Sequence, residues 1–234
     1  MIPMNFEAFL ESLFPAECQS CGCGLAAKEK NLCPTCFSHI LEHRISFQES
    51  WQNPALPGIR SAWSAFHYQG KIRTLLQRIK FKREFYLLAP LCHAAAGLFQ
   101  GIISDVYYDA LIPMPVDWTR RLARHFNQSD ILAGHLARWG HVPVQNQLLV
   151  KRSLSRPQSE LSREMRRWNL FGAFKVPQPH RVAGKSFLLI DDIVTTGSSA
   201  SEAARTLLNR GAKRVDLFTL ARSVLISHPA RPTV

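Results

Sequence analysis

The stretch FLLIDDIVTTGSSA, residues 187–200, decides how this sequence folds. Four apolar residues lead directly into Asp191 and Asp192, and a short segment rich in hydroxyl groups follows around Gly197. Two adjacent carboxylates repel each other and resist burial, so a strand that ends in them needs polar partners at that end. The pattern therefore predicts a buried strand whose carboxyl end carries a polar site.

A helix is expected directly after this loop, because both of its ends are marked. Ser198 or Ser199 is the expected N-cap, and Glu202 stands near the capping-box position. Gly211 lies just past the expected end. In open parallel sheets, ligands bind beyond the carboxyl ends of strands, where the N-terminus of the next helix offers free N–H groups to an anion.

Magnitudes indicate what would hold such an anion. A hydrogen bond to a charged group contributes about 1.5–3 kcal/mol, whereas a helix dipole contributes about 0.3–1 kcal/mol. Residues 195–199 therefore predict a phosphate cradle built mainly from hydrogen bonds. Carboxylates accept hydrogen bonds from vicinal hydroxyls, so the neighbouring acid pair predicts a ligand shaped like a ribose 5-phosphate.

The chain from residue 61 onward alternates apolar strands with amphipathic helices. The expected strands are 61–68, 109–116, 142–150, 185–192 and 213–221. The expected helices are 71–83, 86–103, 127–139 and 198–211. This alternation predicts parallel strands joined by helices, the doubly wound α/β class. A stretch at 151–174 is basic and weakly patterned, and its part at 151–167 is long for a connection inside a compact domain, which favours a functional role over a plain loop.

Five of the six cysteines crowd into the first 36 residues, and four of them form two CxxC pairs. Two such turns aim four thiolates at one tetrahedral Zn²⁺ ion, which contributes about 10–16 kcal/mol in small modules that cannot fold on their apolar surface alone. The expected ligands of this structural zinc are Cys18, Cys21, Cys33 and Cys36. Cys23 is interpreted as a spare thiol and Cys92 as a core residue. A redox or disulfide cluster is the alternative.

The chain has 234 residues, enough for one full domain and a small appendage. Pro54, Pro57 and Gly58 mark a linker. A zinc-binding module with its linker is therefore expected at residues 1–60, followed by an α/β domain at 61–234.

Charge and hydropathy suggest the class of partner. Lys and Arg number 29 against 17 for Asp and Glu, which gives a net charge of +12. This excess favours phosphate-bearing ligands or nucleic acid, with a solvated basic surface as the alternative. The chain is interpreted as lacking both a run of about 18 uncharged apolar residues and a secretory signal. A cytoplasmic protein without membrane insertion is expected.

The acid pair with its strand and loop resembles the phosphoribosyl-pyrophosphate (PRPP) motif of type I phosphoribosyltransferases at every position. Further stretches resemble the ComF family of competence-associated proteins, in which a cysteine-rich zinc head precedes such a domain. These stretches are YQGKIRTLLQRIKFKR (68–83), IPMPV (112–116), RLARHFNQSDILA (121–133) and RPQSELSREMRRWNLFGAF (156–174). They cover nearly the whole chain in the family's order. His125 is a departure, because the family usually has Gly there.

The resemblance implies a type I phosphoribosyltransferase fold, a parallel sheet flanked by helices, with a small zinc-binding module at its N-terminus. It also implies roles for residues of the site. Asp191 and Asp192 would bind the ribose hydroxyls of PRPP, which would arrive with Mg²⁺. The implied cradle of the 5-phosphate consists of Thr195, Thr196, Gly197, Ser198 and Ser199.

Two further segments take roles from the same resemblance. The turn at Met114 and Pro115 would approach the pyrophosphate of PRPP. Arg163, Arg166 or Arg167, in the basic stretch, would close over the leaving pyrophosphate and exclude water.

Two classes of function follow. The first is an enzyme that transfers a phosphoribosyl group to an unidentified amine or base. The second is a competence factor, working with other competence proteins, that uses the PRPP fold for binding while its basic surface holds single-stranded DNA. The candidate DNA contacts are Lys80, Lys82 and Arg83 around Phe81, and a solvated helix face is the alternative. Asn127 is interpreted either as a helix cap or as a ligand contact.

Overall fold

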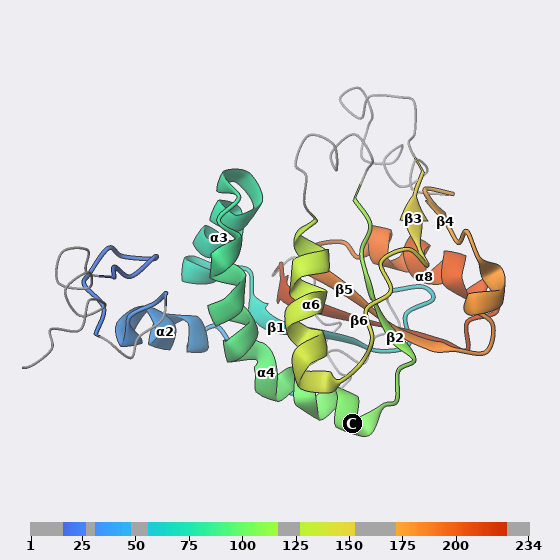
Figure 1. Cartoon of the computed structure of the whole chain (residues 1–234), viewed down its shortest axis with the longest axis horizontal. Coiled ribbons are helices and arrows are strands. Elements are labelled where there is room, and N and C mark those ends of the chain that lie inside the picture. Colours follow the sequence, from blue (N-terminus) through green and yellow to red (C-terminus); the bar gives the residue numbers. More distant parts are fainter. Residues whose placement is uncertain (1–15, 27–30, 48–55, 117–126, 153–171, 224–234) are drawn as a thin grey trace, which may run out of the picture.

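The computed structural model describes residues 16–26, 31–47, 56–116, 127–152 and 172–223 (Figure 1). Its α-helices are α2 (Pro34–Leu41), α3 (Gly70–Gln77), α4 (Leu88–Asp105), α6 (Gln128–Gly140) and α8 (Ser198–Leu208). Its strands are β1 (Ala62–His67), β2 (Ala110–Pro113), β3 (Val150–Lys151), β4 (Phe174–Lys175), β5 (Ser186–Val194) and β6 (Arg214–Arg222). Shorter helical turns lie at Arg78–Lys82, Phe85–Leu87 and Pro179–Arg181.

Four strands form a parallel sheet in the order β1-β6-β5-β2, as the alternating sequence predicted. Strand β5 has β6 on one side and β2 on the other, and it pairs with β6 over most of its length. A single parallel bridge between Leu111 and Val144 extends the sheet beyond β2, and β3 and β4 form a separate antiparallel ribbon. The acid pair therefore follows directly after the part of β5 that pairs with both neighbours: the pairing with β2 ends at Ile190, and Asp191 lies opposite Thr219 of β6.

Helices cover both faces of this sheet. Leu188 and Ile190 of β5 join the cluster of buried side chains that contains α3, α4 and α6. Phe187 and Leu189, the alternate residues of the same strand, join the cluster that contains α8. A strand buried on both faces reads as a continuous apolar run, which is why Phe187 to Ile190 shows no polar alternation.

The strand expected at 142–150 is the main error in the predicted elements. Within that range the structure has only the bridge at Val144 and the first residue of β3, Val150. Pro143 cannot donate a hydrogen bond to a neighbouring strand, and three polar residues at 145–147 follow it. The other predicted strands and helices are present, with their ends shifted by a few residues.

Helix α4 corrects the interpretation of hydropathy. The segment Phe85–Asp105 is long and apolar enough to cross a membrane, with a mean hydropathy of 1.5, so the statement that no such window exists is wrong. Half of this window is buried inside the structure. Leu91, Phe99 and Ile102 are fully buried in the core that α4 shares with α6 and the sheet. A core helix passes the same test of length and composition.

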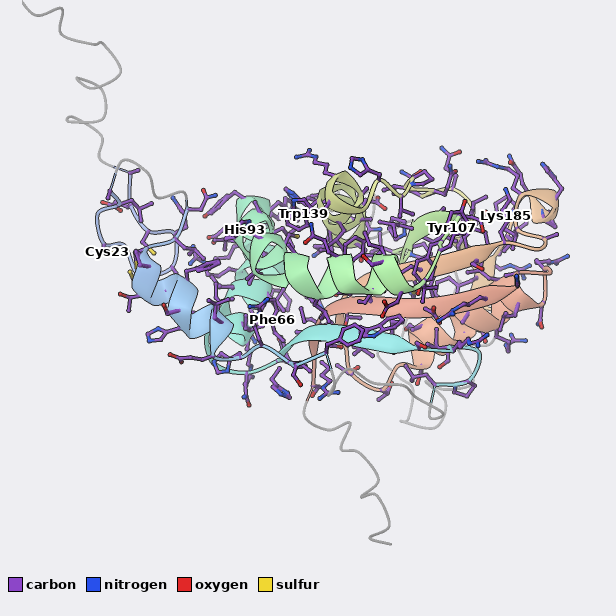
Figure 2. All side chains as sticks on the ribbon, turned by 90° about the horizontal axis from the view of Figure 1, so that it is seen from below. Cys23, Phe66, His93, Tyr107, Trp139 and Lys185 are labelled. Atoms are coloured by element: carbon purple, nitrogen blue, oxygen red, sulfur yellow. The ribbon has the colours of Figure 1, made fainter. Side chains whose placement is uncertain are left out.

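The N-terminal segment packs directly on the larger domain, beside α3 and α4 (Figure 1). His43 and Ile45 exchange backbone hydrogen bonds with β1, at 2.9 Å each. The ring of Phe37 of α2 lies 6.1 Å from that of His93 of α4, centroid to centroid. His93 in turn lies 6.4 Å from the ring of Trp139 of α6 (both labelled in Figure 2). The cysteine-bearing head and the domain therefore share one buried core, while the division at residue 60 stays a prediction.

Candidate functional site

The two adjacent aspartates lie near the carboxyl end of β5, and both are partly accessible. Asp191 Oδ1 accepts the backbone N–H of Asp192 at 2.9 Å and the hydroxyl of Ser129 at 3.1 Å. Asp192 Oδ1 accepts the backbone N–H of Ile193 at 2.8 Å. Within the described residues neither carboxylate forms an ion pair with Lys or Arg. Among the described residues the pair is therefore held by hydrogen bonds alone.

The electrostatics of the pair reflect this lack of a cation. Burial raises the pKa of Asp191 to about 8, and the neighbouring charge of Asp192 adds to the rise. The N–H of Asp192 and the hydroxyl of Ser129 act in the opposite direction, because both stabilise the ionised form. Asp191 therefore ionises less readily than an exposed aspartate does.

The loop after β5 turns sharply into α8. Gly197 adopts a left-handed conformation with φ of 72° and is the N-cap residue, which corrects the expectation of Ser198 or Ser199. Ser198 is already helical, and its hydroxyl lies 2.9 Å from that of Thr196. The first backbone bond of α8 runs from Ser201 N–H to Gly197 O. The Ser198 N–H donates to the Thr196 hydroxyl at 3.4 Å, whereas the N–H groups of Ser199 and Ala200 have no partner within the described residues and remain available to a ligand.

Glu202 does not complete a capping box, contrary to expectation. Its carboxylate accepts the backbone N–H of Gly172 at 2.7 Å and pairs with Arg205 at 2.7 Å. Glu202 thus links the chain just before β4 to α8, the helix that follows the loop.

A cavity of about 80 Å³ lies between the loop, the carboxyl end of β5 and the middle of β6. It is lined by Asp191, Ile193, Val194, Thr195, Thr196, Gly197, Ser198, Ser199, Ala200, Leu217 and Thr219. The structure thus brings all five residues of the predicted phosphate cradle and one acid of the pair around one space. Thr219, at its floor, is fully buried and lies 2.7 Å from the Ser64 hydroxyl, so this polar wall is internally satisfied.

A second cavity of about 160 Å³ lies at the carboxyl end of β2. It is lined by Pro113, Pro115, Val116, Asn127, Asp130, Asn146, Leu149, Val150 and Lys151. Pro115 therefore faces open space at the predicted pyrophosphate turn, whereas Met114 is buried and its N–H binds Ile190 O. Asn127 proves to be the N-cap of α6, since its side chain accepts the N–H of Ser129.

Four residues singled out in the sequence lie outside the described residues. These are Arg163, Arg166 and Arg167, which were expected to close over the pyrophosphate, and His125, the departure from the family pattern.

The N-terminal cysteines form a candidate metal centre. One sulfur atom from each of four residues lies within 4.8 Å of the others, and these residues are Cys18, Cys21, Cys33 and Cys36. Backbone N–H groups donate to the Sγ atoms of Cys18 and Cys33 at 3.3 and 3.4 Å. Burial raises the pKa of Cys18, but hydrogen bonds outweigh it and bring the pKa down to about 6. Four convergent sulfur donors fit a closed tetrahedral metal site.

The other two cysteines lie outside this set. Cys23 Sγ is 3.4 Å from Cys21 Sγ in an exposed loop of the head (Figure 2). Cys92 is fully buried in the core of α4, as expected.

The candidate nucleic-acid contacts lie on an irregular turn. Arg78–Lys82 is a π-helix, and Arg83, which ends it, has a left-handed φ of 62°. Phe81 is 70% exposed, and Lys80 Nζ lies 5.9 Å from its ring centroid. The side chain of Arg78 donates to Glu84 at 2.5 Å and to the backbone oxygen of Gln19, so this turn also touches the head.

Comparison with known proteins places this geometry in a family. Residues 129–231 match the model of the phosphoribosyl transferase domain. The DNA utilization protein YhgH of Escherichia coli O157:H7 is 29% identical over 213 residues, covering 86% of this chain and 89% of that protein. Competence protein ComFC of Bacillus subtilis (strain 168) is 30% identical over 213 residues, covering 88% and 84%. This chain belongs to the ComF family.

The family assignment and the parallel sheet with its loop identify the α/β domain as a type I phosphoribosyltransferase fold. A solved hypoxanthine phosphoribosyltransferase from Staphylococcus aureus superimposes on 62% of this chain and 69% of that one, with 14% identity and a TM-score of 0.39. So loose a superposition adds nothing to the assignment.

Two residues at this site of the ComF-family chain were not predicted. Ser129 precedes the acid pair by 62 residues and reaches it from α6. Leu56, from the expected linker, packs under the loop, because a Cβ atom on Gly197 would meet its Cδ2 at 2.0 Å. The only sequence signal near Ser129 was the helix-cap pattern at Asn127. That pattern placed Ser129 in the first turn of a helix but did not predict its contact with Asp191.

Proposed function

We propose that this ComF-family chain binds PRPP with Mg²⁺ at the carboxyl end of β5 and transfers its phosphoribosyl group to an acceptor. One observation carries the proposal: Asp191, which forms no ion pair with Lys or Arg in the described residues, lines one cavity together with a glycine-containing loop at a helix N-terminus, and Asp192 is its neighbour on the strand. A ribose 5-phosphate supplies hydroxyl donors to the carboxylates and an anion to the loop.

Each part of the site has a separate task in this proposal. Asp191 and Asp192 accept hydrogen bonds from the ribose hydroxyls and so fix the sugar ring. The N–H and hydroxyl groups of residues 195–199 hold the 5-phosphate, and the turn at Pro115 faces the pyrophosphate. Mg²⁺ arriving with PRPP would offset the charge of the pyrophosphate and would need few ligands from the protein.

The transfer needs no protein nucleophile. The bond between C1 of the ribose and the pyrophosphate oxygen breaks, and its electron pair leaves with the pyrophosphate. A lone pair of the acceptor forms the new bond to C1 from the opposite side, with inversion. The protein contributes position, because a sugar fixed at its hydroxyls and at its phosphate presents C1 in one orientation.

Isothermal titration with PRPP and Mg²⁺ tests the binding site. We expect Asp191→Asn/Asp192→Asn to lose affinity by at least tenfold, because a hydrogen bond to a charged group contributes about 1.5–3 kcal/mol. Asp105→Asn is the matched control, since Asp105 is exposed at the end of α4. Equal affinity in the native and doubly substituted proteins would remove the site assignment. Release of pyrophosphate in the presence of candidate amines and bases tests the transfer.

A second function is favoured by the π-helical turn. An exposed aromatic ring with lysines on both sides can stack on a base while the cations contact phosphates. We propose that Lys80, Phe81 and Lys82 bind single-stranded DNA, alongside or instead of catalysis. The names of the relatives, a DNA utilization protein and a competence protein, support a link to DNA uptake together with other competence proteins.

Fluorescence anisotropy with a labelled oligothymidine tests this second function. We expect affinity to fall steeply with added salt, and Phe81→Ala to weaken binding by about tenfold. Tyr107→Ala is the matched control, since Tyr107 is 79% exposed and lies beyond the end of α4 (Figure 2). Binding that both variants leave unchanged would rule out this turn as the DNA contact.

The site of action proposed for the chain is the cytoplasm. A reducing compartment keeps clustered thiolates available to a metal, which supports this location. The metal proposed for the head is a structural zinc, because four sulfur donors leave no position for a substrate.

A further inference from the structure

The N-terminus of α6 reaches the acid pair through a short chain of hydrogen bonds. The amide nitrogen of Asn127 donates to Met114 O at 3.0 Å, in the turn after β2. Its amide oxygen accepts the N–H of Ser129 at 3.2 Å, and the Ser129 hydroxyl donates to Asp191 Oδ1 at 3.1 Å. The turn after β2 is thus connected to the acid pair after β5 through two buried side chains of one helix.

Burial makes this arrangement specific. Ser129 is 3% exposed and Asn127 is 7% exposed, so water does not compete freely for their hydrogen bonds. Asp191 uses Oδ1 for both of its donors, and within the described residues Oδ2 accepts no hydrogen bond. The Ser129 hydroxyl therefore holds one carboxylate oxygen in place while the other is left for a ligand.

We propose that Ser129 is a positioning residue for the acid pair: its hydroxyl fixes the orientation of Asp191 and favours its ionised form. That this serves sugar binding rests on the proposed function, whereas the effect on Asp191 does not. Asn127 holds Ser129 at the start of α6 and ties it to the turn that faces the pyrophosphate.

The surroundings of Asp191 leave Ser129 with a distinct task. On its own strand the neighbouring charge is Asp192, which opposes ionisation. From β6 its register partner is Thr219, and β2 carries no titratable residue. The nearest acid on α6 is Asp130, whose carboxylate accepts a hydrogen bond from Asn127 at 3.2 Å. The Ser129 hydroxyl is therefore the side-chain donor that stabilises the Asp191 carboxylate in the free protein.

Carboxyl ¹³C NMR on the full chain tests the proposal without any ligand, with the Asp191 signal assigned by its loss in Asp191→Asn. We expect Ser129→Ala to raise the pKa of Asp191 by about one unit, since one hydrogen bond to a charged group is lost. Ser129→Thr keeps the hydroxyl and should restore the native titration. Ser201→Ala is the matched control, because the Ser201 hydroxyl is buried without a partner within the described residues.

The pH dependence of PRPP affinity supplies the second readout. Below pH 8, Ser129→Ala should bind PRPP with Mg²⁺ about tenfold more weakly than the native protein. That difference should shrink above the pKa of both proteins, where Asp191 is ionised in each. A loss from general loosening of the structure would be similar at every pH.

The outcomes separate the two proposals. An unchanged Asp191 titration in Ser129→Ala, or a loss of affinity that is equal at every pH, would overturn the role of Ser129. If Ser129→Ala does not fold, Ser129→Cys, with a weaker donor, should give a smaller rise in the same direction. If the native protein binds no PRPP, the proposed function fails while the NMR titration still decides the role of Ser129.

Discussion

Substitution of Gly197 tests how the loop is built. An alanine here has two separate costs. Its φ of 72° lies in the left-handed region, and its Cβ would stand 2.0 Å from Leu56 Cδ2 and 3.0 Å from Leu56 Cδ1. Gly184 has nearly the same φ, 73°, but no atom within 4 Å of an added Cβ. The pair of glycines therefore separates backbone strain from the steric clash.

The magnitudes follow from these two terms. A left-handed alanine costs about 1–2 kcal/mol, so Gly184→Ala should lower the free energy of unfolding by that amount. Leu56 is only 4% exposed and cannot turn away freely, so Gly197→Ala adds a packing cost of about 1–3 kcal/mol. Leu56→Ala alone should cost about 2–5 kcal/mol through the cavity that it leaves.

Urea unfolding of the single variants and of Leu56→Ala/Gly197→Ala measures the coupling. The double variant should be more stable than the sum of the single effects predicts, by about 1–3 kcal/mol, because removing the leucine removes the clash. PRPP affinity should fall in Gly197→Ala and stay native in Gly184→Ala. Equal costs at the two glycines, or additive effects at Leu56 and Gly197, would refute the packing of Leu56 under the loop.

Three further predictions concern charge and metal. The pKa of Asp191 is raised to about 8 in the folded protein against an ordinary 3.8, so the folded state binds more protons than the unfolded state between these two pH values. The free energy of unfolding, measured with urea, should therefore fall as pH rises from about 4 to 8. Asp191→Asn should flatten that dependence. Removal of zinc by a chelator should lower the melting temperature, because the ligand Cys18 lies in the core shared with the domain. Cys23→Ser should keep the native zinc content, measured by atomic absorption. A chelator without effect on folding would contradict the metal centre. Glu202→Gln should speed proteolysis near Gly172, which the carboxylate anchors, and unchanged cleavage would argue against that anchor.

The sequence predicted those features that depend on neighbouring residues. The run from Phe187 to Ile190 is apolar because both faces of β5 are covered, and that pattern is visible without a structure. The two CxxC pairs are likewise predictable from local sequence, since one tight turn is enough to bring the two sulfurs of each pair together. The sheet and the four-sulfur cluster were therefore predictable.

Features that depend on contacts between distant parts of the chain could not be predicted from the sequence. Ser198 and Ser199 looked like caps, but Leu56 leaves room for no side chain at Gly197, and the glycine takes the cap position itself. Glu202 looked like part of a capping box, but Gly172 N–H offers it a partner from another element. Ser129 meets Asp191 only because α6 packs against β5. Each of these choices depends on a tertiary contact that local pattern does not encode.

The most direct test of the central claim is a crystal structure of the protein with PRPP and Mg²⁺. We expect the 5-phosphate inside the loop of residues 195–199, with the ribose hydroxyls on Asp191 and Asp192. Well-defined PRPP bound elsewhere, with an empty loop and no contact to either carboxylate, would contradict it.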